Sequence, residues 1–296
     1  LSGSTEQPEL TYELLGNNLL VSEVFVEQAV GNGNIKWNEQ KPVALNLELT
    51  GIQGINNQVD SAKIVIIGDA SDHQLDLTTS GQSTRVNLSL QGQLSQTSWH
   101  GNWLSGDIES SYANLTLLDP FKIGADWAKQ EYFIAPHCWR HTENELCIKK
   151  AEFKKNTFVW DVSLKEFDVL SVVSRLMPGI PLIQTKSRLN IDMTGDWDIE
   201  HLPNANLSAS LSPGNWVFSE QSNLQLSLDE TLVEAQITPK SILAKINLSG
   251  NKIGSLSASV EGQLGVYADQ LNRPIQGELT IERFDLAALK ALIPPV

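Results

Sequence analysis

The sequence predicts an all-β protein that carries two short amphipathic helices. Segments in which apolar and polar residues alternate recur along the whole 296-residue chain, and this is the period of a half-buried β-strand. Gly, Asn, Asp, Ser and Pro separate these segments, as residues at turns do. Only two stretches have the three-and-four apolar spacing of an amphipathic helix. About eighteen strands are therefore expected.

The first clear strand is predicted over 43–50, where leucines and polar residues occupy opposite faces. The same pattern continues almost to the end of the chain. One apolar face is expected to hold Leu45, Leu47, Leu49, Val86, Leu88, Leu90, Trp160, Val162, Leu189, Ile191, Leu207, Leu211, Leu224, Leu226, Leu228, Ile242, Ile246, Leu248, Val260, Leu279 and Ile281.

The two helices are predicted over 167–178 and 284–294. Each follows a strand, opens with Phe-Asp and closes at Pro, so the Asp can cap the first turn and the Pro can end the helix. Their similarity indicates a diverged repeat. We expect one continuous segment over 1–296, with repeat-like units at 1–156 and 157–275 and the start of another at 276–296. The incomplete last unit indicates a piece of a longer protein.

Two helices of this length cannot cover the apolar face of so many strands. Either the sheet folds on itself as a sandwich or barrel, or it curves into a groove whose apolar lining meets a ligand. Eighteen strands stacked at about 4.8 Å extend over roughly 85 Å. A groove of that length suits acyl chains better than a small polar substrate.

Charge and motifs exclude several classes of function. With 21 Lys+Arg against 35 Asp+Glu, the formal charge of -14 repels phosphate, so neither nucleic acid nor an anionic membrane surface is an expected partner. The sequence has no GxSxG, HExxH or phosphate-loop motif, and we expect neither an enzyme nor a cofactor. The histidines at 73, 100 and 201 lie in polar, loop-like contexts and are expected at the surface.

Both cysteines lie in the segment Ile134 to Ile148. A disulfide between Cys138 and Cys147 would close a loop of about ten residues and contribute about 2.5–3 kcal/mol. It would also place the protein in an oxidising compartment, the periplasm or the exterior. The alternative is a zinc site formed by these cysteines with His137 and His141. Adjacent His137 and Cys138 point apart in an extended chain, and the cysteine spacing is not that of a usual zinc finger, so no metal is expected.

The run Pro136-His-Cys-Trp139, then Glu145-Leu-Cys147, a Phe-Asp helix, the turn Gly195-Asp-Trp197 and the linker Leu202-Pro-Asn-Ala205 resemble the TamB family of AsmA-like proteins. The match is most specific from about Asp126 to Val296. The resemblance implies an elongated, curved antiparallel sheet that forms an open groove with an apolar interior, lined by the residues above.

The resemblance also implies a function. It suggests an internal periplasmic segment of a protein anchored in the inner membrane by an N-terminal helix outside this chain. Such a segment would carry phospholipid acyl chains along the groove from the inner to the outer membrane, with phospholipid as cargo. A TamA-type outer-membrane β-barrel would be a partner through regions absent here. The alternative is a scaffold that assists outer-membrane protein assembly by β-strand addition.

Overall fold

The structure of the chain is a computed structural model. It describes residues 2–4, 7–21, 24–36, 43–54, 57–81, 84–110, 114–170, 173, 182–218, 224–229, 231–251, 254–263 and 275–282. Nearly all of these residues lie in 23 β-strands, and the pairings between them are antiparallel. The prediction of an all-β, antiparallel protein is confirmed.

The chain forms two compact units, Leu1–His141 and Thr142–Val296, here called unit 1 and unit 2. Each unit makes most of its contacts within itself. The repeat-like units 1–156, 157–275 and 276–296 are a different kind of division and stay a prediction.

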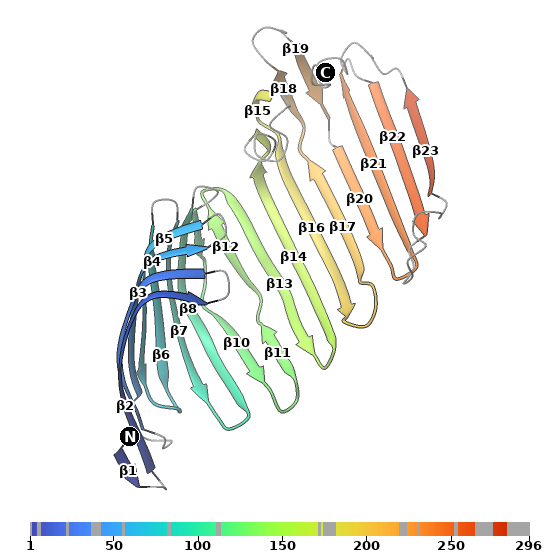
Figure 1. The fold of residues 1–296 in the computed structure, drawn as a ribbon. Helices are drawn as coiled ribbons and strands as arrows, with labels where there is room; N and C mark the ends of the chain where they lie inside the picture. Colours follow the sequence, from blue (N-terminus) through green and yellow to red (C-terminus); the bar gives the residue numbers. More distant parts are fainter. Residues whose placement is uncertain are drawn as a thin grey trace. The chain divides into compact units, whose positions relative to one another are not determined.

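Unit 1 is a single sheet in which each strand from β1 to β8 pairs with the next (Figure 1). One half of β8 pairs with β10 and the other with β9; β10 then pairs with β11, and β9 with β12. The strands are β1 Ser2–Ser4, β2 Gln7–Val21, β3 Val24–Lys36, β4 Val43–Gly54, β5 Asn57–Gly68, β6 His73–Ser80, β7 Thr84–Leu94, β8 Ser98–Ser110, β9 Asn114–Leu117, β10 Phe121–Asp126, β11 Glu131–Ile134 and β12 His137–His141.

Strands β2 to β5 bend along their length (Figure 1). The ladder skips one residue of each strand at the same level, namely Asn18, Glu27, Gly51 and Asp60. Asn18 and Gly51 have positive φ angles of 53° and 61°. A Cβ atom on Gly51 would lie 2.6 Å from the Cβ of Glu27. The bend therefore depends on glycine at position 51, for its backbone conformation and for its missing side chain.

Unit 2 is built on a run of paired strands in the order β13, β14, β16, β17, β20, β21, β22 and β23. A smaller row, β15, β18 and β19, joins the end of β21 through β19. The strands are β13 Asn144–Lys154, β14 Thr157–Asp168, β15 Leu182–Thr185, β16 Arg188–Asp198, β17 Asn204–Leu211, β18 Gly214–Phe218, β19 Leu224–Leu228, β20 Thr231–Ile237, β21 Ser241–Asn251, β22 Gly254–Gln263 and β23 Ile275–Glu282.

The start of the first predicted helix is wrong by two residues. Phe167 and Asp168 are the last residues of β14, paired with Leu189 and Arg188, and helical conformation begins at Val169. The strand continues because a bulge at Glu166, which has a φ of 58°, returns Phe167 to the ladder. Most of the remainder of this helix lies outside the described residues, as does the whole of the second predicted helix, 284–294.

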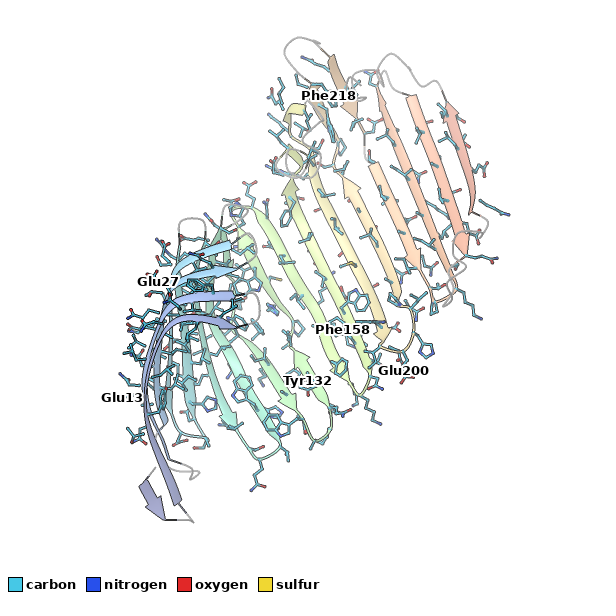
Figure 2. The ribbon with its side chains drawn as sticks, viewed as in Figure 1. Glu13, Glu27, Tyr132, Phe158, Glu200 and Phe218 are labelled. Atoms are coloured by element: carbon cyan, nitrogen blue, oxygen red, sulfur yellow. The ribbon has the colours of Figure 1, made fainter. Side chains whose placement is uncertain are left out.

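A closed hydrophobic core lies where the smaller row meets the larger sheet. Its buried members are Leu182, Phe218, Leu226 and Leu228, and Phe218 is only 1% exposed (Figure 2). Leu170 and Val173 of the helical segment pack against this cluster, with Trp216 and Leu248. The helical segment thus seals one corner of unit 2.

Candidate functional site

Strand pairing aligns the apolar residues of unit 2 into rows that cross the sheet. Residues directly opposite one another in a ladder share a face, and residues two apart on a strand share it as well. One row crosses seven strands through Leu164, Ile191, Ala209, Val233, Ile246, Ala258 and Leu279. The next runs through Val162, Met193, Leu207, Ala235, Ala244, Val260 and Gly277. Seven strands at about 4.8 Å give each row a length of roughly 29 Å.

Six further residues expected in the groove lie on the same face, in the neighbouring rows: Trp160, Leu189, Leu211, Ile242, Leu248 and Ile281. We call this surface the apolar face of unit 2. Alternation in the sequence predicts which residues of one strand share a face, and strand pairing in the structure places these residues of different strands side by side. Whether they line a groove for lipid stays a prediction.

Much of the apolar face of unit 2 is open to solvent. Met193 is 39% exposed, Val260 45%, Ile281 47% and Leu279 62%. Among the described residues, the extensive backbone contacts between elements are those between paired strands. Exposed apolar patches are often binding surfaces, so the apolar face of unit 2 is a candidate site.

The opposite face of the same strands is polar. Its central row contains Asp192, Ser208, Glu234, Lys245, Ser259 and Glu278. Lys149 Nζ lies 3.0 Å from Asp192 Oδ1 and 3.8 Å from Asp161 Oδ1, and its hydrogen bond to Asp192 raises the pKa of Lys149. The two faces differ sharply, so a ligand of the apolar face need not contact charged groups.

The leucines of β19 have a different environment. Leu226 is 4% exposed and Leu228 is 8% exposed, because both belong to the closed core with Phe218. Leu224 is the first residue of β19, and its side chain lies outside the described ones. The two described leucines therefore stabilise the fold and are not accessible to a ligand.

Unit 1 has a similar set of apolar rows. Apolar residues of β5, β6, β8, β9 and β10 pair with the predicted residues of β4 and β7 and extend their rows; these partners follow the same alternation in the sequence. The rows are Leu45, Ile66, Leu75, Leu90, Trp103 and Phe121; Leu47, Ile64, Leu77 and Leu88; and Leu49, Ala62, Thr79, Val86, Ile108 and Leu115.

An apolar hollow of about 290 Å³ lies along the middle of the first row, lined in part by Leu75, Leu90 and Trp99. The indole Nε1 of Trp99 donates to His73 Nε2 at 2.7 Å, so Nε2 is unprotonated and the ring proton lies on Nδ1, 3.0 Å from the Asp69 carbonyl oxygen. His73, expected at the surface, lines this hollow and is half-buried, since the hydrogen bond draws it against the tryptophan.

Aromatic rings cluster at the β10 end of the first row. Phe121 stacks on His137 with their ring centroids 3.6 Å apart, and Trp139 meets Trp103 edge-on at 6.0 Å. Trp139 fits because Gly106 leaves space: a Cβ atom there would lie 2.4 Å from the indole ring. Burial lowers the pKa of His137, so its ring is neutral at pH 7.

The cysteine segment carries a disulfide. Cys138 and Cys147 are both disulfide-bonded, as the sequence predicts, and so supply no thiolate for zinc. Among the described residues, no group of three or more His, Cys, Asp or Glu side chains is placed to hold a metal ion. Nor is any described helix long and apolar enough to cross a membrane.

Comparison with known proteins agrees with the resemblance seen in the sequence. The family model for the TamB N-terminal domain matches residues 1–296. The translocation and assembly module subunit TamB of Haemophilus influenzae is 21% identical over 299 residues, which cover 99% of this chain and 22% of that protein. The chain thus spans about a fifth of the length of this relative. No solved structure matches it. Because the family model covers the whole sequence, the chain belongs to the TamB family.

Proposed function

We propose that this chain is a segment of a periplasmic conduit that carries phospholipid acyl chains from the inner to the outer membrane. The observation that carries the proposal is the apolar face of unit 2, where rows of aliphatic side chains cross seven strands and stay partly exposed. Acyl chains are apolar ligands of matching chemistry. Phospholipid is the cargo in this proposal, and no cofactor is required.

The energetics suit transport better than tight binding. An acyl chain that removes about 100–150 Å² of apolar surface from water gains about 2.5–4 kcal/mol. This attraction is non-directional, and successive strands along a row offer similar side chains about 4.8 Å apart. An acyl chain that moves along a row by one strand exchanges contacts of similar strength, so the barriers between positions stay low.

The wider setting of the conduit is part of the proposal. A protein that contains this chain would be anchored in the inner membrane by a helix outside the sequence and would work with a TamA-type β-barrel in the outer membrane. The printed name of the Haemophilus influenzae relative makes that protein a subunit of a translocation and assembly module. The disulfide is in keeping with an oxidising periplasm.

The second candidate is a scaffold for outer-membrane protein assembly, and the edge strand β23 favours it. Among the described strands, β23 pairs only with β22, and the residues from Gln276 to Glu282 are exposed. A substrate strand could add to this edge through backbone hydrogen bonds.

Site-specific photo-crosslinking distinguishes the two functions. A photoreactive residue in place of Leu279, which is 62% exposed on the apolar face, should capture phospholipid that mass spectrometry identifies. The same residue in place of Glu278, on the opposite face, is the matched control and should capture none. Capture of protein and no lipid at both positions would overturn the conduit in favour of the scaffold.

A further inference from the structure

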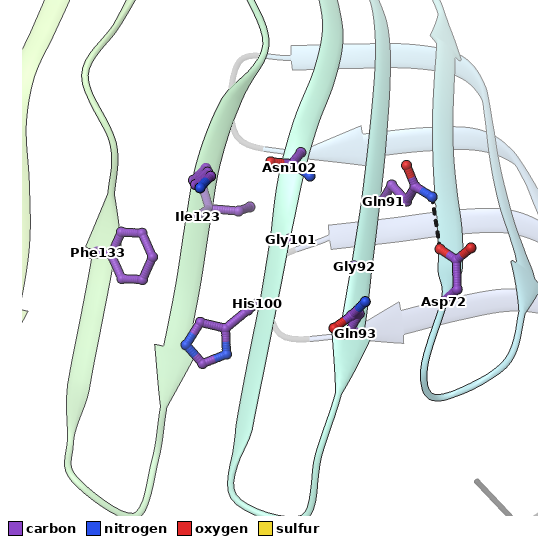
Figure 3. Close-up of a pocket in the computed structure, with 10 residues that line it drawn as sticks. Asp72, Gln91, Gly92, Gln93, His100, Gly101, Asn102, Ile123 and Phe133 are labelled. Atoms are coloured by element: carbon purple, nitrogen blue, oxygen red, sulfur yellow. Dashed lines mark hydrogen bonds between the residues drawn. The ribbon is translucent and has the colours of Figure 1, made fainter. Parts of the chain in front are cut away.

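A hollow of about 430 Å³ lies on the polar face of unit 1, where β7, β8, β10 and β11 run side by side (Figure 3). Two rows of residues form it. One contains Gln91, Asn102 and Lys122, and the other Gln93, His100, Gly124 and Phe133. The volume is within the range of about 300–1,000 Å³ that is typical of small-molecule sites. The hollow is on the opposite face from the apolar rows, and the lipid conduit does not use it.

An aromatic wall distinguishes this hollow from the rest of the polar face. The ring of Phe133 is half-buried and tilted by 45° against His100, with their centroids 6.2 Å apart (Figure 3). Both rings close over Gly124, where a Cβ atom would lie 2.4 Å from the Phe133 ring and 3.0 Å from His100. Because Gly124 has no side chain, the ring of Phe133 can pack directly against the backbone of the sheet on its polar face, and part of the ring stays accessible to solvent.

The other walls carry neutral amides. Gln91, Gln93 and Asn102 each offer an N–H donor and a carbonyl acceptor. Gln91 Nε2 donates to Asp72 Oδ1 at 2.8 Å, which orients this amide with its oxygen away from the carboxylate. Asp72 and Lys122 carry opposite charges, so the hollow is close to neutral at pH 7.

We propose that this hollow binds a neutral carbohydrate. The C–H face of a sugar ring would pack on Phe133 and His100, while its hydroxyl or N-acetyl groups would exchange hydrogen bonds with the three amides. A purely aliphatic ligand would leave the amides unsatisfied. A phosphorylated ligand would meet a single lysine in a chain of formal charge -14. A sugar has an apolar C–H face that fits the aromatic wall, and hydroxyl groups that both donate and accept hydrogen bonds, as the amides do.

Calorimetric titration of the whole 296-residue chain with the tetrasaccharide of N-acetylglucosamine tests the proposal. We expect binding, with weaker binding of a phosphorylated lipopolysaccharide core oligosaccharide. Phe133→Ala should weaken tetrasaccharide binding about tenfold. Tyr132→Ala is the matched control, because Tyr132 is the neighbouring aromatic residue on the opposite face of β11, and it should bind as the unaltered chain does.

Gln93→Ala keeps the test informative if Phe133→Ala fails to fold. Gln93 is exposed, so its replacement leaves the sheet intact and should weaken binding about fivefold through a lost hydrogen bond. The proposal is overturned if the tetrasaccharide does not bind at millimolar concentration or if the phosphorylated core binds equally or more tightly. It is also overturned if Gln93→Ala binds unchanged or if Tyr132→Ala loses as much affinity as Phe133→Ala.

Discussion

Replacing Ile246 with aspartate places a charge in the middle of the apolar face of unit 2. Ile246 is half-buried between Val233 and Ala258, so the folded state should lose only about 1–2 kcal/mol of apolar burial. An acyl chain that crosses this row would have to cover an unpaired carboxylate, at a cost of about 3 kcal/mol or more. That cost corresponds to a fall in lipid occupancy of roughly 100-fold.

The assay is lipid capture by a photoreactive residue at position 279, quantified by mass spectrometry. Asn247→Asp is the matched control: it adds the same charge one residue along, on the opposite face, and Asp retains the oxygen that accepts from Ser257 Oγ at 2.9 Å. We expect Ile246→Asp to abolish capture and Asn247→Asp to preserve it. Normal capture by a folded Ile246→Asp variant, or equal loss in both, would refute the conduit along this face.

Three further predictions concern stability. Leu226→Ala should lower the free energy of unfolding by about 2–5 kcal/mol in urea titration, because it empties part of the closed core; a loss below 1 kcal/mol would contradict that assignment. Gly51→Ala should cost about 1–3 kcal/mol, whereas Gly54→Ala, whose new methyl group would meet nothing within 4 Å, should cost less than half as much. Replacing both Cys138 and Cys147 with serine should cost about 2.5–3 kcal/mol by thermal unfolding and leave lipid capture unchanged; loss of capture in the folded variant would give the disulfide a functional role.

Alternation predicts which residues share a face, and the pairings follow it closely in both units. It predicts neither register nor bends. The bend through β2 to β5 depends on Asn18 and Gly51, whose positive φ angles and mutual alignment arise only once the strands pair. Glycine at position 51 is visible in the sequence, but its alignment with Glu27 of another strand is not.

Local signals at the ends of elements proved less exact. The Phe-Asp pair at 167–168 precedes a helical segment, as predicted, but both residues stay in the ladder because Leu189 and Arg188 pair with them. His73 follows a polar turn and was expected at the surface. A tryptophan 26 residues away provides its hydrogen bond, and this contact depends on the pairing of β6, β7 and β8.

Leu226 and Ile246 show why an alternating pattern cannot by itself identify a ligand site. Both belong to runs of alternating aliphatic residues, and β19 and β21 are paired neighbours. Leu226 is sealed because the helical residues Leu170 and Val173 pack on its cluster, whereas the row of Ile246 continues to Leu279, which is 62% exposed. Whether a row of apolar residues is core or candidate binding surface therefore depends on whether another segment, distant in sequence, packs over it. Leu226→Asp should therefore unfold the corner of unit 2 around the closed core. Ile246→Asp should leave the fold intact and lower lipid occupancy.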